Sequence, residues 1–329
     1  MEEKQTKVLV TGGAGYIGSV LIGQLLQSNY RVTTIDNLSF GGNALLAYLS
    51  HPYFEFIKGD VCFKKDLAEA LKNIDAVIHL AAIVGDPACK INPELAQQVN
   101  KEGAELLCQM SLENGVRRFI FASTCSNYGK MPDPHGYVNE TTPLNPVSLY
   151  AHLKVDFEKY LMSNANDTFA PVCLRFATAY GLSPRPRFDL TVNEFTHELV
   201  LGKKLDIYGE RFWRPYCHVT DIARACVLAL EADRSVVVTQ TFNVGDNEEN
   251  YQKKTLIKMI LKELPHRKNL VSYITRDEDP RDYRVNFDKI KKTLGFSVRK
   301  SVPDGIREII FAIESGLIKN PQDKIYQNV

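Results

Sequence analysis

A glycine-rich turn between an apolar strand and an amphipathic helix is the feature that most constrains the fold. Residues 7–11 (KVLVT) form a short, largely β-branched apolar run, which predicts a buried strand. Gly12, Gly15 and Gly18 follow at GxxGxxG spacing, and residues 16–27 then carry apolar side chains at helical intervals. Such a turn lets the backbone approach a diphosphate, and the helix N-terminus offers its N–H groups to the phosphates. The segment therefore predicts a dinucleotide-binding unit, with an ordinary strand–helix turn as the alternative.

Strands and helices alternate through the first half of the chain. Further strands are predicted at 31–36, 54–58, 76–80, 119–123 and 172–176. Helices are predicted to begin near 67–71, to run over 95–113, and to continue past Lys154 to about Leu161. Alternation of this kind implies right-handed βαβ units and a parallel sheet. We expect an α/β fold: a Rossmann-type doubly wound parallel sheet with a smaller mixed α/β substrate lobe.

The composition of the chain changes after residue 180. Residues 181–189 contain two prolines and two arginines, predict an irregular loop, and open a second lobe. A strand near 215–219 and a helix at 220–231 then resume the sheet domain. We expect a cofactor domain at 1–180, with 212–245 returning to it, and a substrate-binding lobe formed by 181–211 and 246–329.

Charge and cysteine content exclude several classes of protein. The 40 basic and 39 acidic residues give a net charge of +1, so no global field favours nucleic acid or an anionic membrane. No apolar run approaches the roughly 20 residues of a membrane span, and the charged N-terminus is not typical of a secretory signal. The seven cysteines show no CxxC pair or zinc-like spacing. We expect no metal and a reducing, cytoplasmic location.

A tyrosine and a lysine one helical turn apart form a candidate acid/base pair. Tyr150 and Lys154 stand at i and i+4, so a helix places both side chains on one face. A free phenol, with a pKa of about 10, is a poor base at neutral pH, but a nearby ammonium stabilises the phenolate. Thr124 follows a predicted strand, and its hydroxyl would bind the substrate oxygen that Tyr150 deprotonates. A chance helical pair and a hydroxyl-rich turn are the alternatives.

Two acids stand where strands end. Asp36 ends the second predicted strand, where a carboxylate accepts both ribose hydroxyls of an adenosine and repels a 2′-phosphate. Because Asn37 rather than an arginine follows it, NAD is favoured over NADP. Asp60 is placed to bind an adenine amino group or, alternatively, to cap the next helix.

The motifs in this order resemble the extended short-chain dehydrogenase/reductases, and within them the NAD-dependent sugar-nucleotide epimerases and dehydratases of the UDP-glucose 4-epimerase type. The resemblance spans about residues 7–296 and includes TGGAGYIG (11–18), GDV (59–61), HLAA (79–82), STCSNYG (123–129), LRFATAYG (174–181) and RPYCHVTDIARA (214–225). It implies NAD as cofactor and Thr124, Tyr150 and Lys154 as catalytic residues. The implied cofactor-binding residues are Gly12, Gly15, Tyr16, Ile17, Gly18, Asp36, Asn37, Asp60, Val61, Leu80, Ala81, Ala82, Tyr150, Lys154 and Phe176.

The resemblance also implies substrate-binding residues. Arg214 and Arg281 stand where family members hold a substrate diphosphate, which suits a planar guanidinium. Thr178 replaces an asparagine that many members use to contact the substrate, and Asn193 is expected to face it. Ser126 and Arg187 complete the expected set; a solvated basic loop is the alternative for Arg187.

The expected reaction follows from one departure. Family dehydratases place Asp-Glu after the catalytic threonine, whereas Cys125 and Ser126 stand here, which disfavours a 4,6-dehydratase. We expect a sugar-nucleotide 4-epimerase acting through a 4-keto intermediate. The alternatives are a nucleotide-sugar 4-dehydrogenase or 4-ketoreductase of a surface-polysaccharide or deoxysugar pathway, and a redox-silent NAD-binding regulator. The resemblance further implies a homodimer.

Overall fold

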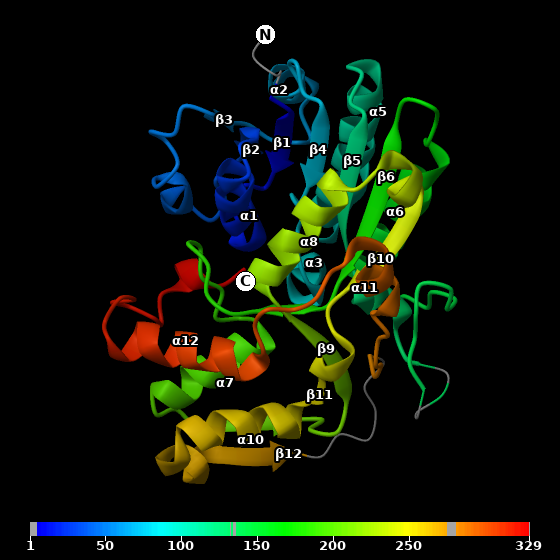
Figure 1. Ribbon diagram of the computed structural model, residues 1–329. Helices are drawn as coiled ribbons and strands as arrows, with labels where there is room; N and C mark the ends of the chain where they lie inside the picture. The colour runs from blue at the N-terminus through cyan, green and yellow to red at the C-terminus, as the bar shows by residue number, and fades with distance from the viewer. Residues whose placement is uncertain (1–4, 132, 134–135, 275–280, 329) are drawn as a thin grey trace. The chain divides into compact units, whose positions relative to one another are not determined.

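The structure, a computed structural model, describes residues 5–131, 133, 136–274 and 281–328 (Figure 1). The strands are β1 (Lys7–Thr11), β2 (Arg31–Asp36), β3 (Phe54–Lys58), β4 (Ala76–His79), β5 (Arg118–Thr124), β6 (Ala170–Phe176), β7 (Thr178–Tyr180), β8 (Leu205–Tyr208), β9 (Trp213–His218), β10 (Gln240–Val244), β11 (Asn250–Gln252) and β12 (Val271–Ile274). The α-helices are α1 (Tyr16–Gln27), α2 (Lys64–Ala70), α3 (Asp86–Ile91), α4 (Pro93–Gln97), α5 (Ala104–Glu113), α6 (Leu149–Ser163), α7 (Thr191–Val200), α8 (Val219–Glu231), α9 (Arg234–Val237), α10 (Lys253–Glu263), α11 (Asp288–Leu294) and α12 (Val302–Glu314).

A seven-stranded sheet in the order β10-β6-β5-β4-β1-β2-β3 confirms the predicted doubly wound fold. β1 pairs in parallel with β2 on one side and with β4 on the other, so the strand order reverses beside β1. Ligands of such sheets bind beyond the carboxyl ends of the strands at this switch point. The glycine turn, Asp36 and Leu80 all follow or end strands at that edge.

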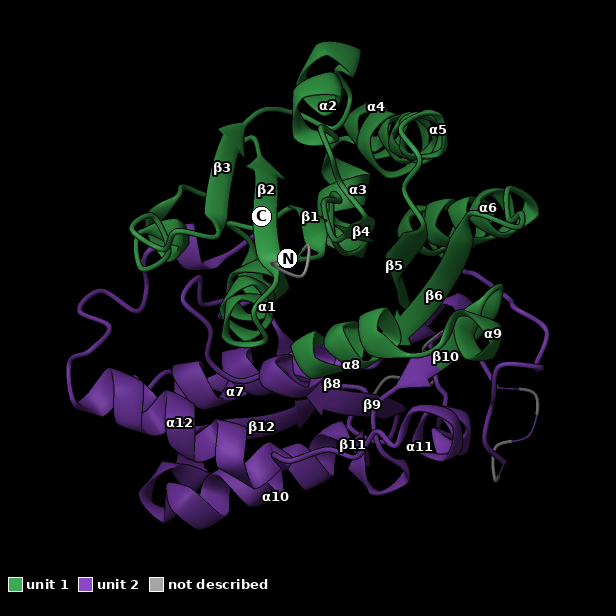
Figure 2. Ribbon diagram, turned by 45° about the horizontal axis from the view of Figure 1, so that its top comes forward, with its two compact units in different colours: residues 1–124, 148–175, 223–242 green, residues 125–147, 176–222, 243–329 purple. Residues whose placement is uncertain are grey.

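The chain folds into two compact units (Figure 2). The first contains residues 1–124, 148–175 and 223–242, and the second contains 125–147, 176–222 and 243–329. These ranges differ from the predicted division, which kept 125–147, 176–180, 212–222 and 243–245 with the cofactor domain. That the units correspond to a cofactor domain and a substrate lobe stays a prediction.

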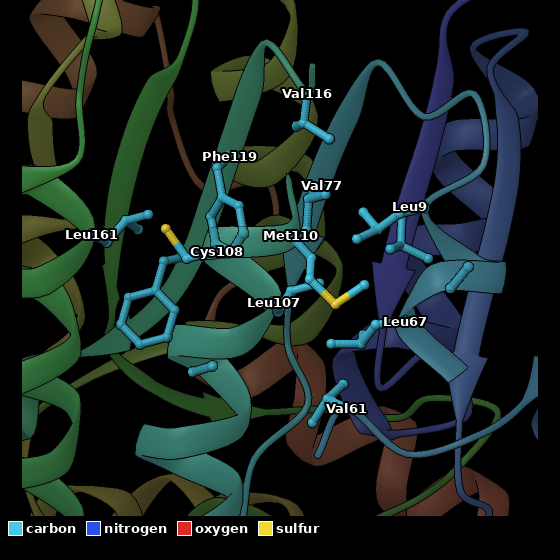
Figure 3. Close-up of a cluster of buried hydrophobic side chains, with 14 of the residues drawn as sticks. Leu9, Val61, Leu67, Val77, Leu107, Cys108, Met110, Val116, Phe119 and Leu161 are labelled. Atoms are coloured by element: carbon cyan, nitrogen blue, oxygen red, sulfur yellow. The ribbon is translucent and has the colours of Figure 1, made fainter. Parts of the chain in front are cut away.

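One core cluster of the first unit lies between the sheet and the helices α2, α5 and α6. Leu9, Val77 and Phe119 are register partners on β1, β4 and β5, so they form one row across the sheet. They pack in one buried cluster with Leu107 and Met110 of α5 (Figure 3). Burial of this apolar row against the helices stabilises the central strands of the sheet, whose carboxyl ends carry the candidate site.

The predicted helix over 95–113 is interrupted. The structure contains α4, a π-helical segment at Gln98–Gly103 and then α5. Asn100 of the π-helical segment accepts from Ile83 N–H at 2.8 Å and donates to Ile83 O at 2.8 Å. Irregular helix turns of this kind are frequent at functional sites, and this one holds the backbone just beyond β4.

The second unit contains two small sheets, β11-β9-β7 and β12-β8. Its core joins side chains of these sheets to α7, α10 and α12, including Val192, Tyr216, Ile257 and Ile306. The predicted irregular loop at 181–189 is confirmed. The strand and helix predicted after it are present as β9 and α8, but β9 pairs with β7 and β11 in the second unit and does not resume the large sheet as expected.

Two further observations concern the described residues. None of their helices is long and apolar enough to cross a membrane, and no group of three or more His, Cys, Asp or Glu among them is arranged to hold a metal ion.

Candidate active site

The glycine turn leaves room for backbone approach at the carboxyl end of β1. Gly12 has a φ of +74°, and a Cβ there would lie 2.8 Å from Ala81 N. A Cβ on Gly18 would lie 2.3 Å from Gly12 O, so α1 must begin directly against the turn. Gly15 caps α1 without a side-chain hydrogen bond, and no acidic residue occupies the first turn. The first N–H groups of α1, from Tyr16, Ile17 and Gly18, therefore lie in the position that favours a diphosphate.

Asp36 is held by backbone groups at the end of β2. Its Oδ2 accepts from Ala14 N–H at 3.0 Å and its Oδ1 accepts from Leu38 N–H at 2.8 Å. The carboxylate thus joins the glycine turn to the loop after β2. This is the predicted position for binding an adenosine ribose.

Asp60 and Asn37 are brought together beyond β2 and β3. Asn37 Nδ2 donates to Asp60 Oδ2 at 2.9 Å, and Asp60 Oδ1 accepts from Cys62 N–H at 2.9 Å. Partial burial opposes ionisation, but these hydrogen bonds lower the pKa of Asp60 below its ordinary value. The N-cap of α2 is Phe63, so Asp60 is not the helix cap that formed its alternative interpretation.

A buried histidine ties the end of β4 to the end of β1. Thr11 Oγ1 lies 2.7 Å from His79 Nδ1 and accepts from Ala81 N–H at 3.2 Å. Burial, with a smaller effect of Lys154, lowers the pKa of His79 to about 3, so the ring is neutral. Leu80, Ala81 and Ala82 follow directly, half-buried, and Val61 is buried. Phe176 ends β6 and is also buried.

Tyr150 and Lys154 lie on one face of α6, as predicted. Ser148 caps the helix by accepting from Ala151 N–H at 3.3 Å. Lys154 Nζ lies 5.8 Å from the Tyr150 ring centroid and 4.6 Å from that of Phe121, and donates to Ala122 O at 2.9 Å.

Two further features concern the residues predicted to take part in proton transfer. Burial lowers the pKa of Lys154 to about 8, and the largest of the weaker opposing effects come from Cys89 and Glu158. Thr124 ends β5 and is half-buried, two residues after the carbonyl that Lys154 binds.

In the second unit, three predicted substrate residues gather around a tyrosine that the sequence analysis missed. Tyr283 is buried, forms a side-chain hydrogen bond with Ser126, and is influenced electrostatically by Arg214 and Arg281. The Arg214 guanidinium lies 5.3 Å from the Tyr283 ring centroid, and its Nη1 donates to Trp213 O at 2.7 Å. A cation held over an aromatic face is favourably placed. The other residues of the EDPR motif, 278–280, lie outside the described residues.

The remaining substrate candidates have protein partners. Arg187 forms a two-pronged ion pair with Asp189, with N–O distances of 2.6 and 3.0 Å. Asn193 is buried, accepts from Gly181 N–H at 2.9 Å and donates to Arg187 O at 2.9 Å. Thr178 pairs with Tyr216 across β7 and β9. Contact of these residues with a substrate stays a prediction.

The residues at the switch point fit an NAD molecule. The space beside Gly12 and Gly18, which a Cβ would fill, suits the diphosphate, and Asp36 suits the adenosine ribose. Lys154 is buried one helical turn from Tyr150, and its contact with the cofactor stays a prediction. Fold and site together define a dinucleotide-dependent α/β enzyme with a tyrosine–lysine pair.

Comparison with known proteins gives the family. The model of the NAD-dependent epimerase/dehydratase family matches residues 8–245, and the chain belongs to this family. It is 30% identical over 321 residues to a dTDP-glucose 4,6-dehydratase of Actinoplanes sp., covering 92% of this chain and 96% of that one.

Solved structures agree with this assignment. A UDP-glucose 4-epimerase of Thermotoga maritima, solved with UDP-glucose, is similar with a TM-score of 0.84 and 28% identity, covering 95% of this chain and 100% of that one. A UDP-glucose 4-epimerase of Thermus thermophilus, solved with NAD, gives 0.82 and 26%, covering 94% and 99%. The predicted family, its NAD dependence and its enzymatic character are confirmed.

Proposed function

We propose that this enzyme is a sugar-nucleotide 4-epimerase that inverts C4 of its substrate through a 4-keto intermediate. The observation that carries the proposal is the pairing of Tyr150 with buried Lys154 on α6, at 5.8 Å between Nζ and the ring centroid. UDP-glucose 4-epimerases among the similar structures support it. When bound, NAD supplies the hydride acceptor and donor.

The protein's own groups manage the proton. Tyr150, as phenolate, removes the proton from the sugar 4-hydroxyl, and the Lys154 ammonium stabilises that phenolate. With a pKa of about 8, Lys154 is largely protonated at pH 7 and still close to releasing its proton. Thr124 orients the 4-oxygen. Arg214 and Arg281 bind the substrate diphosphate, with Arg214 supported by the Tyr283 ring.

The two residues after Thr124 disfavour dehydration, although dehydratases are among the relatives. Cys125 is 1% exposed and Ser126 is hydrogen-bonded to Tyr283. Neither position offers the carboxylic acid that would protonate a leaving hydroxyl. If the 4-ketone is released before it is reduced again, the enzyme is instead a 4-dehydrogenase or, in reverse, a 4-ketoreductase.

Incubation of the purified protein with UDP-, dTDP-, GDP- and CDP-linked glucose tests the proposal, with chromatographic separation of the epimers, mass spectrometry and NADH absorbance as readouts. A 4-epimer of unchanged mass without net NADH is the expected result. Stoichiometric NADH with a product two hydrogens lighter would identify a dehydrogenase, and loss of water would identify a dehydratase; either outcome contradicts epimerisation.

Tyr150→Phe tests the catalytic assignment. Because the variant has no ionisable phenol, we expect kcat to fall by about 10²–10⁴-fold, while NAD affinity measured by calorimetry stays close to that of the wild type. A Tyr150→Phe enzyme with wild-type kcat would remove Tyr150 from the mechanism.

We also propose a homodimer in the cytoplasm. The family resemblance supports pairing through helices of the first unit, where Leu106, Leu112, Tyr160 and Met162 are only partly buried on the outer side of the core cluster. The seven cysteines are free thiols, which suits a reducing compartment. Light scattering that gives the mass of one chain at micromolar concentration would exclude the dimer.

A further inference from the structure

One face of α6 carries three polar side chains in succession. Tyr150, Lys154 and Glu158 stand at i, i+4 and i+8 on this helix, and Glu158 is 5% exposed. A carboxylate is rarely buried to this extent unless it is paired and hydrogen-bonded. The groups that compensate Glu158 therefore indicate what it does.

Glu158 is bound by side chains from two strands of the same unit. Arg175 of β6 approaches it with Nη2 at 2.7 Å from Oε2 and Nε at 3.0 Å from Oε1, a two-pronged ion pair. Ser123 of β5 donates its hydroxyl to Oε1. One carboxylate thus fastens α6 to β5 and β6 together.

These contacts lie directly beside the candidate catalytic residues. Lys154 Nζ donates to Ala122 O at 2.9 Å, and Ser123 binds Glu158. α6 therefore meets β5 at two successive residues, and the next residue along β5 is Thr124. Any shift of α6 along β5 would change the position of Tyr150 relative to the Thr124 hydroxyl.

Glu158 also supplies a negative charge near Lys154. Besides Tyr150, the titratable groups among the described residues that act on or feel this ammonium include Cys89 on α3, Cys173 on β6 and His79 on β4. Burial raises the pKa of Cys89 to about 11 and that of Cys173 well above its ordinary value, so both thiols are neutral at pH 7. His79 is neutral as well, which leaves the Glu158 carboxylate as the charge that opposes the effect of burial on Lys154.

We propose that Glu158 is a positioning residue for the reaction: through Ser123 and Arg175 it fixes α6 against β5 and β6, and its charge keeps the Lys154 ammonium beside Tyr150. This inference rests on the proposed roles of Tyr150 and Thr124. It assigns Glu158 no contact with substrate or cofactor. Its effect reaches Thr124 through Ser123, the preceding residue of β5, and reaches Tyr150 through Lys154, one helical turn away on α6.

Glu158→Gln tests the proposal, with Asp75→Asn as the matched control. Asp75 also pairs with an arginine of the first unit, Arg117, at 3.0 Å, but it precedes β4 at the amino-terminal edge of the sheet. Both substitutions convert a paired carboxylate to an amide, and both should lower the midpoint of thermal unfolding. Only Glu158→Gln should change the chemistry.

Two readouts distinguish a positioning role of Glu158 from a contribution to stability alone. With UDP-glucose and dTDP-glucose, we expect Glu158→Gln to lower kcat about 100-fold, the loss associated with a displacement of about 1 Å, while KM changes little. The second readout is the pKa of Tyr150 in the NAD-bound protein, obtained from tyrosinate absorbance with Tyr150→Phe as the blank. This pKa should be higher in Glu158→Gln than in the wild type, because Lys154 releases its proton more readily without Glu158. Ser123→Ala, which removes one hydrogen bond, should lower kcat less.

The outcomes distinguish this inference from the proposed function. A Glu158→Gln enzyme with wild-type kcat and an unchanged Tyr150 titration would overturn the inference. If the single variant does not fold, Glu158→Gln/Arg175→Met removes the guanidinium that Glu158→Gln alone would leave buried without its carboxylate, and the same losses are expected of it. If the wild-type enzyme converts neither UDP-glucose nor dTDP-glucose, only the choice of substrate is contradicted. The tyrosine titration needs no sugar, so it still decides the role of Glu158.

Discussion

At the scale of single residues, the buried ammonium of Lys154 gives stability a defined pH dependence. Burial lowers its pKa from 10.5 to about 8. Between these values the unfolded chain binds a proton that the native protein does not, so the free energy of unfolding rises with pH across this interval. Below about pH 8 both states are protonated, and the cost of the buried charge is fully present.

The increase in unfolding free energy of Lys154→Met over the wild type should therefore be largest at pH 7. Its advantage in unfolding free energy should shrink as the pH rises from about 8 to 10.5. Urea unfolding of both proteins at several pH values measures this difference. Lys72→Met, at a side chain that is 62% exposed, is the control and should show no comparable trend. A constant difference between Lys154→Met and the wild type from pH 7 to 10.5 would contradict a neutral Lys154 at alkaline pH.

The sequence could predict the tyrosine–lysine pair because both members lie on one helical turn. Glu158 continues the same spacing, and the signal for it was present, but a glutamate on a helix is ordinarily exposed. Its partners are 35 and 17 residues away, so only the folded sheet brings Ser123 and Arg175 to it. Tyr283 was missed for a similar reason, since about half of the chain separates it from Ser126.

At the scale of elements, the turn between β1 and α1 can be tested with a matched pair of glycines. Gly12 and Gly115 have φ values of +74° and +72°, so alanine is strained about equally at both. A Cβ at Gly115 meets nothing within 4 Å, whereas at Gly12 it lies 2.8 Å from Ala81 N. Gly115→Ala should lower stability by about 1 kcal/mol and leave NAD binding unchanged.

Gly12→Ala should bind NAD at least about tenfold more weakly. The added Cβ would push the turn away from the residues that follow β4, and this turn is where the diphosphate is expected to bind. Isothermal titration calorimetry of both variants with NAD gives the comparison. Equal NAD affinities for Gly12→Ala and Gly115→Ala would show that the turn does not contact the cofactor.

The sequence predicted elements well where residues close together in the chain determine the local structure. β1 and α1 have the predicted bounds, because an apolar run, a glycine turn and helical spacing follow one another without ambiguity. The π-helical segment at Gln98–Gly103 was not predicted, since its Asn100 side chain meets Ile83 only in the folded unit. Arg187 was predicted to bind substrate, and its neighbour Asp189 supplies a carboxylate partner within two residues.

At the scale of the whole molecule, long-range pairing decides which segments belong together. Residues 125–147 were expected to stay with the cofactor domain, but they join the second unit. Met131 N–H donates to Asp282 O at 3.0 Å, and Val138 N–H donates to Arg284 O at 2.8 Å. No local pattern encodes a pairing between segments so far apart in the chain, so the sequence predicted the elements of each unit better than the boundaries between them.

Cofactor binding should be visible in the stability of the entire protein. A ligand that binds only the native state stabilises it by about 2.7 kcal/mol at 100 times its Kd. Asp36 is held by Ala14 and Leu38 N–H groups at 3.0 and 2.8 Å. In its proposed role, this carboxylate would accept ribose hydroxyls and repel a 2′-phosphate. NAD should therefore raise the thermal unfolding midpoint well above the value with NADP at the same concentration. In Asp36→Asn the repulsion is removed, so the two cofactors should give similar midpoints. Equal stabilisation of the wild type by NAD and NADP would contradict the role assigned to Asp36, and it would leave the glycine turn as the part of the cofactor site that the Gly12→Ala comparison tests independently.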